Sequence, residues 1–374
     1  MHAPDFQRQH FDVWFLFTAV ALVIFGTTMV YSSSAVFALE RYGDSYFFLK
    51  RSLAFAAGGF LLLSFATAID YHRYRRIVYV IMLAVAVLVG LVFIPGIGRS
   101  AAGATRWLKI GPFGFQPSEA AKIATVLFLA YSLEKKAPRI RTFAVGIFPN
   151  MVIVGLLSTL ILVQKDLGSA VILMMMTWLL LFAAGARLRY LFGMLAGLVP
   201  VATILIMGSP YRRQRILAFL NPWNDQYGSG FQMIQSFVAF NEGGVFGRGL
   251  GEGQQKLFYL PEAHTDFILS VIGEELGLLG VVAIAALFLI FCYRGIRIAL
   301  DAPDLFGRYL ALGMTLLIGL EAMLNMGVVM GMLPTKGLAL PFVSYGGSSL
   351  MMSLLAVGVV LNVSSYRSSE RHAE

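Results

Sequence analysis

The sequence is short of the residues that build disulfides, metal centres and charged surfaces. Cys292 is the single cysteine, so no disulfide can form within the chain. One cysteine and five histidines do not provide the spacing of a zinc site. Only 13% of the residues are charged and 58% are hydrophobic, whereas about a quarter of a soluble domain is charged. These shortages exclude a soluble protein and predict an integral membrane protein.

Ten apolar runs of spanning or near-spanning length follow one another along the chain. They cover about 13–31, 53–69, 77–94, 118–133, 143–163, 168–184, 190–207, 267–292, 307–330 and 342–363. The first run has few basic residues before it and no Ala-x-Ala cleavage site, so we expect a retained helix rather than a signal peptide. The sequence therefore predicts an all-α polytopic membrane protein with ten transmembrane helices, forming one domain over residues 1–374.

The distribution of Lys and Arg predicts the orientation of these spans. Ten spans place both termini on one side, where the short loops hold fifteen basic residues against eight in the opposite short loops. Because basic loops stay in the cytoplasm, we expect both termini there. The long loop at about 208–265, between spans seven and eight, is then extracytoplasmic. The net charge of +9 is explained by these basic loops, so no nucleic-acid partner is expected.

A glycine-rich run at 243–253 lies in that long loop and resembles a phosphate-binding loop in composition. No βαβ pattern surrounds it and it faces away from cytoplasmic nucleotides, so we expect no nucleotide site. The glycines are expected to let an irregular backbone pack close to helices. The amphipathic segment 231–240 is expected to lie on the bilayer surface.

Two ionisable residues begin the fourth span. Glu119 and Lys122 are three positions apart, which is about 4.5 Å along a helix axis and on one helix face. One interpretation is structural, with Ser118 as a helix cap and Lys122 neutralising Glu119. Ionisable groups inside a bilayer are expensive, however, and this cost favours a functional role for both.

A long polar segment meets a hydrophobic span at Asp266. Thr265 has the chemistry of an N-cap and Asp266 would occupy the first helical turn, so one interpretation is helix capping. The alternative is a functional carboxylate. The neighbouring His264 and Glu262, at the membrane boundary of a chain that otherwise avoids charge, favour that alternative.

The outer face also carries Asp166, Arg213 and Arg215. Carboxylates and cations at this face suit an anionic ligand with a lipid part. No nucleotide is available there, so an enzyme would need a substrate that carries its own leaving group, such as a lipid-linked pyrophosphate sugar. Arginine would stabilise the departing pyrophosphate, and a carboxylate would take the proton from an attacking hydroxyl.

A transporter is the competing class of protein. Glu274, Glu275, Glu321 and Asn325 lie deeper in spans eight and nine, where they could line a path through the membrane. A lipid flippase therefore stays open as an alternative.

Several motifs together resemble the SEDS family (shape, elongation, division and sporulation) over nearly the whole chain. They are Gly-Pro at 111–112, Gln-Pro-Ser-Glu at 116–119, Lys-Asp-Leu-Gly at 165–168, Pro-Glu-Ala-His-Thr-Asp-Phe at 261–267, Leu-Pro-Thr-Lys-Gly at 333–337 and the run 340–349. Asn-Met-Gly-Val-Val at 325–329 is more similar to the division members than to the elongation members. Family members commonly have Gln-Pro-Asp-Leu-Gly where this chain has Gln-Lys-Asp-Leu-Gly at 164–168, which leaves Lys165 without a family role.

The resemblance implies a peptidoglycan glycosyltransferase of the bacterial inner membrane that polymerises lipid II into β-1,4-linked glycan for septal wall synthesis. It implies Asp266 as the essential catalytic carboxylate, and Glu119 and Lys122 as residues of a central cavity. The alternatives are a lipid II flippase and an elongation polymerase. The implied partners are a class B penicillin-binding protein of the division type, contacting spans eight and nine, and other divisome membrane proteins.

The remaining site residues are assigned to substrate binding. Arg213 and Arg215 are expected to bind pyrophosphate, and Asp166, His264 and Ser344 to line the substrate site. A divalent cation bridging carboxylate and pyrophosphate is chemically compatible with this scheme, but the sequence has no metal-ligand motif, so no metal site is predicted.

Overall fold

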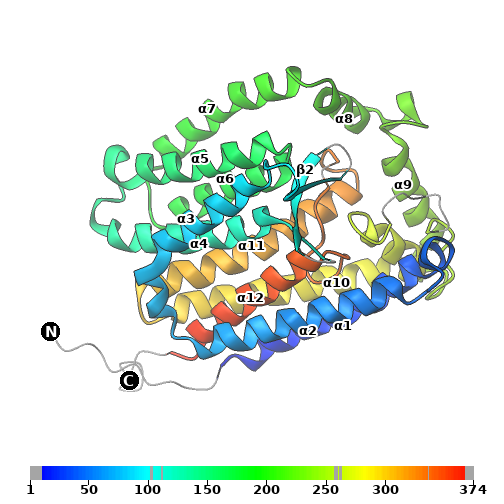
Figure 1. Cartoon of the computed structure of the whole chain (residues 1–374), viewed down its shortest axis with the longest axis horizontal. Helices are drawn as coiled ribbons and strands as arrows, with labels where there is room; N and C mark the ends of the chain where they lie inside the picture. The colour runs from blue at the N-terminus through cyan, green and yellow to red at the C-terminus, as the bar shows by residue number, and fades with distance from the viewer. Residues whose placement is uncertain are drawn as a thin grey trace.

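The computed structural model describes residues 11–101, 104–110, 113–256, 260, 263–335 and 337–366. The motif residues Gly111, Pro112, Pro261, Glu262 and Lys336 lie outside this part of the chain. Figure 1 shows a bundle of long helices that run side by side. All ten apolar runs contain a helix, which confirms the all-α class. These helices are α1 (Val13–Tyr42), α2 (Phe47–Ala68), α3 (Tyr74–Leu91), α4 (Pro117–Lys135), α5 (Phe148–Val163), α6 (Leu167–Ala183), α7 (Leu188–Met207), α10 (Ile268–Asp301), α11 (Leu305–Val329) and α12 (Gly347–Ser364).

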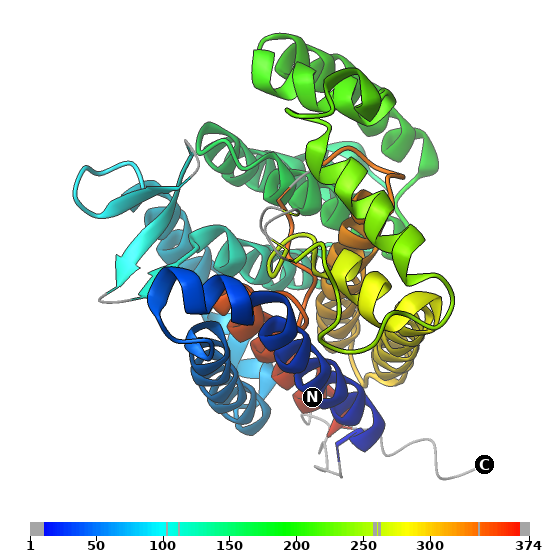
Figure 2. The ribbon, with the colours of Figure 1, turned by 90° about the vertical axis from the view of Figure 1, so that its right-hand side faces the viewer.

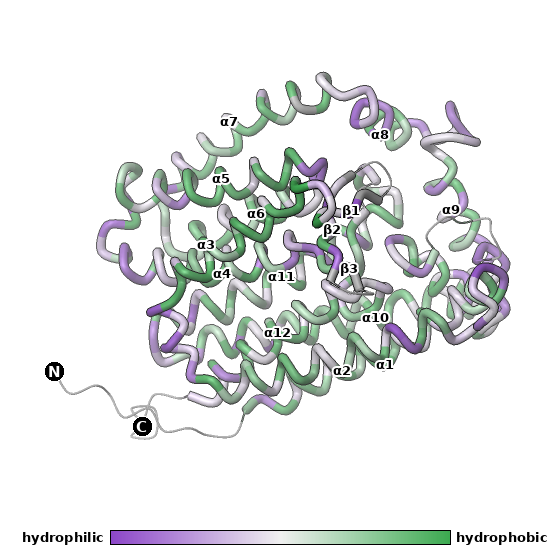
Figure 3. The backbone as a smooth tube through the Cα atoms, in the orientation of Figure 1, coloured by the Kyte–Doolittle hydropathy of each residue, from purple (hydrophilic) through white to green (hydrophobic). Residues whose placement is uncertain are grey.

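Seven helices of the described chain are long and apolar enough to cross a membrane: α1, α2, α3 with the preceding turn, α5 with the preceding turn, α10, α11 and α12. Two further helices, α6 and α7, hold shorter apolar segments, and α4 carries Glu119 and Lys122 in its first two turns. Figure 3 shows apolar residues along the helices and hydrophilic ones toward both ends of the bundle. The protein is therefore a multi-pass membrane protein, and ten as the number of spans stays a prediction.

The start of α1 and the end of α12 lie at the same end of the bundle (Figure 1). The backbone N–H of Asp12 donates to the Ser364 hydroxyl over 3.1 Å, which joins the two ends directly. An even number of crossings requires this arrangement. We call the opposite end, which carries the loop 208–265, the outer end; that it faces the extracytoplasmic side stays a prediction from the distribution of basic residues.

The interior of the bundle is formed by α4 and α11. Residues 120–130 of α4 are almost all buried, and α11 is the most completely buried of the spanning helices, at 72% of its apolar window. In contrast, α7 lies along one edge of the bundle (Figure 1) and exposes Phe192, Val199 and Ile204. The ionisable residues of α4 and α11 are thus enclosed by protein rather than by lipid.

A small antiparallel sheet at the outer end was missed by the hydropathy pattern. It consists of β1 (Gly98–Ala101), β2 (Ala104–Ile110) and β3 (Phe113–Phe115), in that order. The Ser348 hydroxyl of α12 accepts from the N–H of Gln116 over 3.1 Å and donates to the Gly114 carbonyl over 3.4 Å. The sheet thereby ties the start of α4 to the start of α12.

The loop 208–265 has its own structure at the outer end, onto which Figure 2 looks. It contains α8 (Pro210–Leu220), a short turn η4 (Pro222–Asp225) and α9 (Phe231–Gly243). The Ser236 hydroxyl of α9 bonds the Ser270 hydroxyl of α10 and the Val329 carbonyl of α11, both over 2.7 Å. Helix α9 therefore packs small and apolar side chains onto α10 and α11, and its place at the bilayer surface stays a prediction. Further short turns are η1 (Tyr71–Arg73), η2 (Ala137–Arg139) and η3 (Phe143–Ile147).

Helix α10 is interrupted at Gly277, whose backbone has φ 68° and ψ −164°. The N–H groups of Leu278 and Leu279, which the break releases, donate to Gly244 (2.9 Å) and Val245 (3.2 Å) of the glycine-rich run. A Cβ at position 277 would lie 2.4 Å from the Gly247 nitrogen. The expectation that these glycines let an irregular backbone pack close to a helix is confirmed, and the contacts satisfy backbone groups that lipid cannot.

The last helix begins five residues later than predicted, at Gly347 rather than 342. The preceding residues form a turn in which Phe342 has a positive φ of 64°. This turn packs against α1, where a Cβ at Gly26 would lie 2.3 Å from the Phe342 carbonyl oxygen. Hydropathy predicts a helix for this apolar segment, but it forms a turn. The turn is apolar because other parts of the protein bury it.

Candidate functional site

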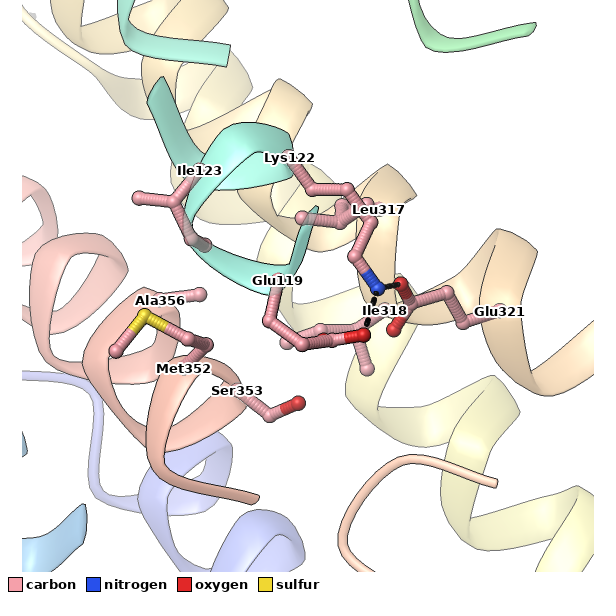
Figure 4. Close-up of a pocket in the computed structure, with 9 residues that line it drawn as sticks. All are labelled: Glu119, Lys122, Ile123, Leu317, Ile318, Glu321, Met352, Ser353 and Ala356. Atoms are coloured by element: carbon pink, nitrogen blue, oxygen red, sulfur yellow. Dashed lines mark hydrogen bonds and ion pairs between the residues drawn. The ribbon is translucent and has the colours of Figure 1, made fainter. Parts of the chain in front are cut away.

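Lys122 lies between two carboxylates in the interior of the bundle (Figure 4). Its ammonium donates to Glu119 Oε1 over 2.8 Å and to Glu321 Oε1 of α11. The lysine side chain is 4% exposed, Glu119 12% and Glu321 6%. The predicted approach of Glu119 and Lys122 on one helix face is confirmed, and Glu321 completes what we call the Lys122 cluster. One ammonium thus has two carboxyl groups as its partners.

A small cavity lies beside the Lys122 cluster. Helix α12 contributes Met352, Ser353 and Ala356 to its wall, and α11 contributes Leu317 and Ile318 (Figure 4). The cavity is mostly apolar apart from the three charged groups and the Ser353 hydroxyl. It gives the cluster a side that protein atoms do not cover.

Asn325 links this cluster to Asp266. It follows Glu321 by one turn of α11, and its amide donates to the Asp266 carbonyl over 2.9 Å and to the Leu338 carbonyl over 2.6 Å. The Asn325 side-chain oxygen is buried and accepts no hydrogen bond. Asn325 therefore holds two outer segments together and leaves one acceptor unused beside them.

The Asp266 carboxylate faces the segment that follows Lys336. A Cβ at Gly337 would lie 3.1 Å from Asp266 Oδ2. Helix α10 begins at Ile268, with Phe267 as its N-cap residue. The interpretation with Thr265 as the N-cap residue and Asp266 in the first turn therefore places the helix start too early. Asp266 lies just before the N-cap residue, outside the helix.

Asp166 has a structural role at the start of α6. Its Oδ1 accepts from the Ser169 N–H (3.1 Å), and its Oδ2 accepts from the Ser169 hydroxyl (2.9 Å), the Ser118 hydroxyl (3.1 Å) and the Gln116 amide (3.2 Å). The carboxylate thus caps α6 and holds it to the start of α4. Its assignment to substrate binding stays a prediction.

His264 and Ser344 are likewise engaged within the protein. The His264 ring lies 4.5 Å from the Phe48 ring, and its backbone carbonyl accepts from the Tyr345 N–H over 2.9 Å. The Ser344 hydroxyl accepts from the Leu340 N–H over 2.8 Å. Burial raises the pKa of the Tyr345 hydroxyl, so this residue stays protonated at neutral pH. These residues build the wall on the α1 and α2 side of the Asp266 segment.

Arg213 and Arg215 of α8 differ in their surroundings. Arg213 is exposed, whereas Arg215 donates to the Thr335 carbonyl over 3.0 Å and lies 4.7 Å from the centre of the Tyr211 ring. Arg215 is therefore close to the segment that leads to Gly337 and Asp266. Arg213 is not brought to that segment by any contact in the described chain.

A second group of buried charged residues surrounds Lys256. The sequence did not predict which residues pair in it. Lys256 donates to Glu275 Oε1 over 2.6 Å, and the Ser32 hydroxyl donates to the same carboxylate over 2.7 Å. Glu274 accepts the N–H groups of Gln254 (2.7 Å) and Gln255 (3.2 Å). We call these residues the Lys256 cluster. Its carboxylates hold the glycine-rich run, so they do not line an open path.

The site combines three features. The Asp266 carboxylate lies outside any helix, Asn325 links its segment to the buried Lys122 cluster, and the Arg215 guanidinium lies near the same segment. Such a set can take a proton from a hydroxyl and can hold an anionic group nearby. The described residues do not gather three or more His, Cys, Asp or Glu side chains into a metal-holding group.

Comparison with known sequences identifies similar proteins. A family model described as "Cell cycle protein" (FtsW/RodA/SpoVE) matches residues 13–369. The chain is 53% identical to a probable peptidoglycan glycosyltransferase FtsW of Geobacter metallireducens, over 95% of each chain. It is 43% identical to the stage V sporulation protein E of Bacillus subtilis, over 95% of this chain and 97% of that one.

Solved structures agree with these similarities. One chain, from work entitled "Structural coordination of polymerization and crosslinking by a peptidoglycan synthase complex", superposes with a TM-score of 0.78 at 31% identity and covers 95% of this chain and 97% of that one. The rod shape determining protein RodA of Thermus thermophilus superposes with a TM-score of 0.71 at 29% identity, over 95% of this chain and 96% of that one.

Proposed function

Because this chain belongs to the FtsW/RodA/SpoVE family of cell cycle proteins, we propose that it is a peptidoglycan glycosyltransferase that polymerises lipid II into β-1,4-linked glycan. The observation that carries the proposal is the position of Asp266. Its carboxylate lies just before α10 and faces Gly337, at the outer end of the bundle, where a lipid-linked sugar would be bound. The names of the relatives support the same activity.

In this proposal Asp266 is the general base. The hydroxyl of the acceptor sugar attacks the anomeric carbon of the donor, and its proton passes to the Asp266 carboxylate as the new glycosidic bond forms. The bond between the anomeric carbon and the phosphate oxygen breaks, and undecaprenyl pyrophosphate leaves. General-base assistance of this kind contributes roughly 10² to 10⁴ in rate.

The Lys122 cluster supports the base rather than replacing it. The charge of Lys122 is already shared by Glu119 and Glu321, so little of it is available to pyrophosphate. Its main effect is to join α4 to α11, which carries Asn325 and thereby the Asp266 backbone. Arg215 is the better candidate for pyrophosphate, because its guanidinium retains free donors and lies by the same segment.

The partner and the cellular role follow from the family. We place the protein in the bacterial inner membrane at the division septum, with both termini cytoplasmic, acting with a class B penicillin-binding protein of the FtsI type and other divisome membrane proteins. The similarity to a chain from a peptidoglycan synthase complex supports such a partner. The 53% identity to an FtsW protein, against 29% to a RodA protein, favours division over elongation.

Reconstitution with labelled lipid II tests this function. Purified protein in liposomes, with its penicillin-binding partner supplied, is expected to yield glycan polymer resolved by gel electrophoresis. Transbilayer movement of lipid II without polymer would contradict the proposal and establish a flippase instead. The closed contacts of Glu274 and Glu275 favour the polymerase, because these carboxylates bind backbone N–H groups rather than line a channel.

A further inference from the structure

A second cavity opens at the outer end, apart from the Lys122 cluster. Helix α8 contributes Tyr211, Gln214 and Arg215, the start of α9 contributes Ser229 and Gln232, and Thr335 closes the remaining side. Its cavity volume is about 140 Å³, and the space is partly open to solvent. This is smaller than a typical pocket for a whole drug-sized ligand, about 300–1,000 Å³, so the cavity suits one unit of a longer ligand. We call this space the Gln214 cavity.

The side chains of the Gln214 cavity offer neutral donors and acceptors. The amides of Gln214 and Gln232 make no hydrogen bond within the described chain, and each can both donate and accept. None of the lining residues is acidic and one is basic, and that one, Arg215, already donates to the Thr335 carbonyl. Apart from Arg215, the lining is therefore neutral. Paired amides beside hydroxyls and an aromatic ring instead match the alternating donors and acceptors of sugar hydroxyl groups.

The cavity is held open by a stable turn. Asp225 Oδ2 accepts from both the N–H and the hydroxyl of Ser229, each over 2.8 Å. These hydrogen bonds hold the pKa of the Asp225 carboxyl below its usual value, so the turn persists at neutral pH. Arg215 fixes the opposite wall through Thr335. The ligand-facing amides are therefore presented by a preformed frame.

The Gln214 cavity lies close to the proposed base. Thr335 lines it, and two residues further along the chain Gly337 adjoins the Asp266 carboxylate. Two residues of even fully extended chain span at most about 7 Å. This separation is comparable to one or two sugar rings, so a ligand in the cavity could continue into the site at Asp266.

We propose that the Gln214 cavity is a saccharide subsite that binds an N-acetylated sugar unit next to the one that reacts at Asp266. This inference rests on the proposed function. The sugar unit belongs either to the growing glycan strand, which the subsite would retain between additions, or to the incoming lipid II. Both sources present the same hydroxyl and acetamido groups to Gln214 and Gln232.

The double variant Gln214→Ala/Gln232→Ala tests the subsite, with Gln226→Ala, an exposed glutamine in the same loop, as the matched control. Full-length protein with its partner is given lipid II, and initial rates and glycan lengths are measured. Losing two hydrogen bonds is expected to weaken sugar binding about tenfold. If the strand occupies the subsite, glycan length falls by about that factor with KM unchanged; if lipid II does, KM rises and length is unchanged.

A double variant with parental KM and glycan length overturns the subsite, and so does an equal effect of Gln226→Ala. Absence of polymer from the parent protein contradicts the proposed function itself, and this inference with it. A second measurement does not depend on turnover. Gln214→Cys, in a Cys292→Ala background, is labelled with maleimide; an oligomer of N-acetylglucosamine is expected to slow this labelling and not that of Gln226→Cys. Equal labelling rates with and without the oligomer also overturn the subsite.

Discussion

The Lys122 and Lys256 clusters each hold two carboxylates and one ammonium, but their surroundings differ. In the Lys256 cluster the Arg248 guanidinium also lies 4.0 Å from Glu274. In the Lys122 cluster the contacts recorded for the ammonium and the carboxylates are to one another, across α4 and α11, and a cavity adjoins them. In the Lys256 cluster the carboxylates also accept backbone N–H groups and the Ser32 hydroxyl.

The difference shows which buried charges are structural and which adjoin a site. Backbone N–H groups stabilise the Glu274 and Glu275 carboxylates in addition to their cations, and they anchor the glycine-rich run at the Gly277 break. The carboxylates of the Lys122 cluster depend on one ammonium. Removing the only cation that compensates a buried carboxylate is costly. A carboxylate beside a cavity can, in addition, respond to a ligand that enters it.

The largest expected effect on stability is from Lys122→Met. This change leaves Glu119 and Glu321 buried without their cation, and breaking a buried ion pair costs about 3–5 kcal/mol. We expect a large fall in the melting temperature measured in detergent, together with loss of polymerisation. The double variant Lys122→Met/Glu321→Gln should recover part of the stability. A Lys122→Met protein as stable as the parent would show that the contacts in Figure 4 do not stabilise the bundle.

Lys256→Met is expected to cost less, because Glu275 keeps the Ser32 hydroxyl and the Gly251 N–H. The loss of one hydrogen bond to a charged group is worth about 1.5–3 kcal/mol. Polymerisation below the melting temperature should be largely retained, unlike in Lys122→Met. If the two lysine variants lost equal stability and equal activity, the distinction between the clusters would be wrong.

The smallest expected effect is from Ser32→Ala. This variant removes one neutral donor, whose bond is worth about 0.5–1.5 kcal/mol, from a carboxylate that retains Lys256 and a backbone N–H. A small decrease in melting temperature with unchanged polymerisation is expected. Ser33→Ala is a suitable control, because the Ser33 hydroxyl only bonds a carbonyl in its own helix, that of Val30. A loss as large as that of Lys256→Met would show that the Ser32 hydroxyl, not the ammonium, compensates Glu275.

Hydropathy predicted the positions of the helices because lipid imposes length and composition on each span separately. The contact between Glu119 and Lys122 was predictable for a similar reason, since both lie on one helix. The contact between Lys122 and Glu321 was not predictable, because it depends on how α4 packs against α11. The two residues are 199 positions apart in the chain. The same limit applies to the partner of Lys256, which depends on a loop folding back onto α10.

Local errors arose where protein, rather than lipid or water, surrounds the chain. The turn before Gly347 is apolar because it is buried against α1, so hydropathy extended α12 into it. The capping chemistry of Thr265 would start the helix at Asp266, whereas α10 begins two residues further on, at Ile268. The three strands were missed because they are too short to give a hydropathy signal, although the Gly-Pro at 111–112 is a turn signal.

The central claim, that Asp266 is the general base, is tested most directly by Asp266→Asn. Asparagine keeps the size of the side chain and its hydrogen-bonding capacity but removes the basic carboxylate. Glycan formation from lipid II and the melting temperature in detergent are measured on the same preparation. The expected result is a loss of at least about 10² to 10⁴ in rate with an unchanged melting temperature. Near-parental polymerisation by a stably folded Asp266→Asn protein would contradict the claim.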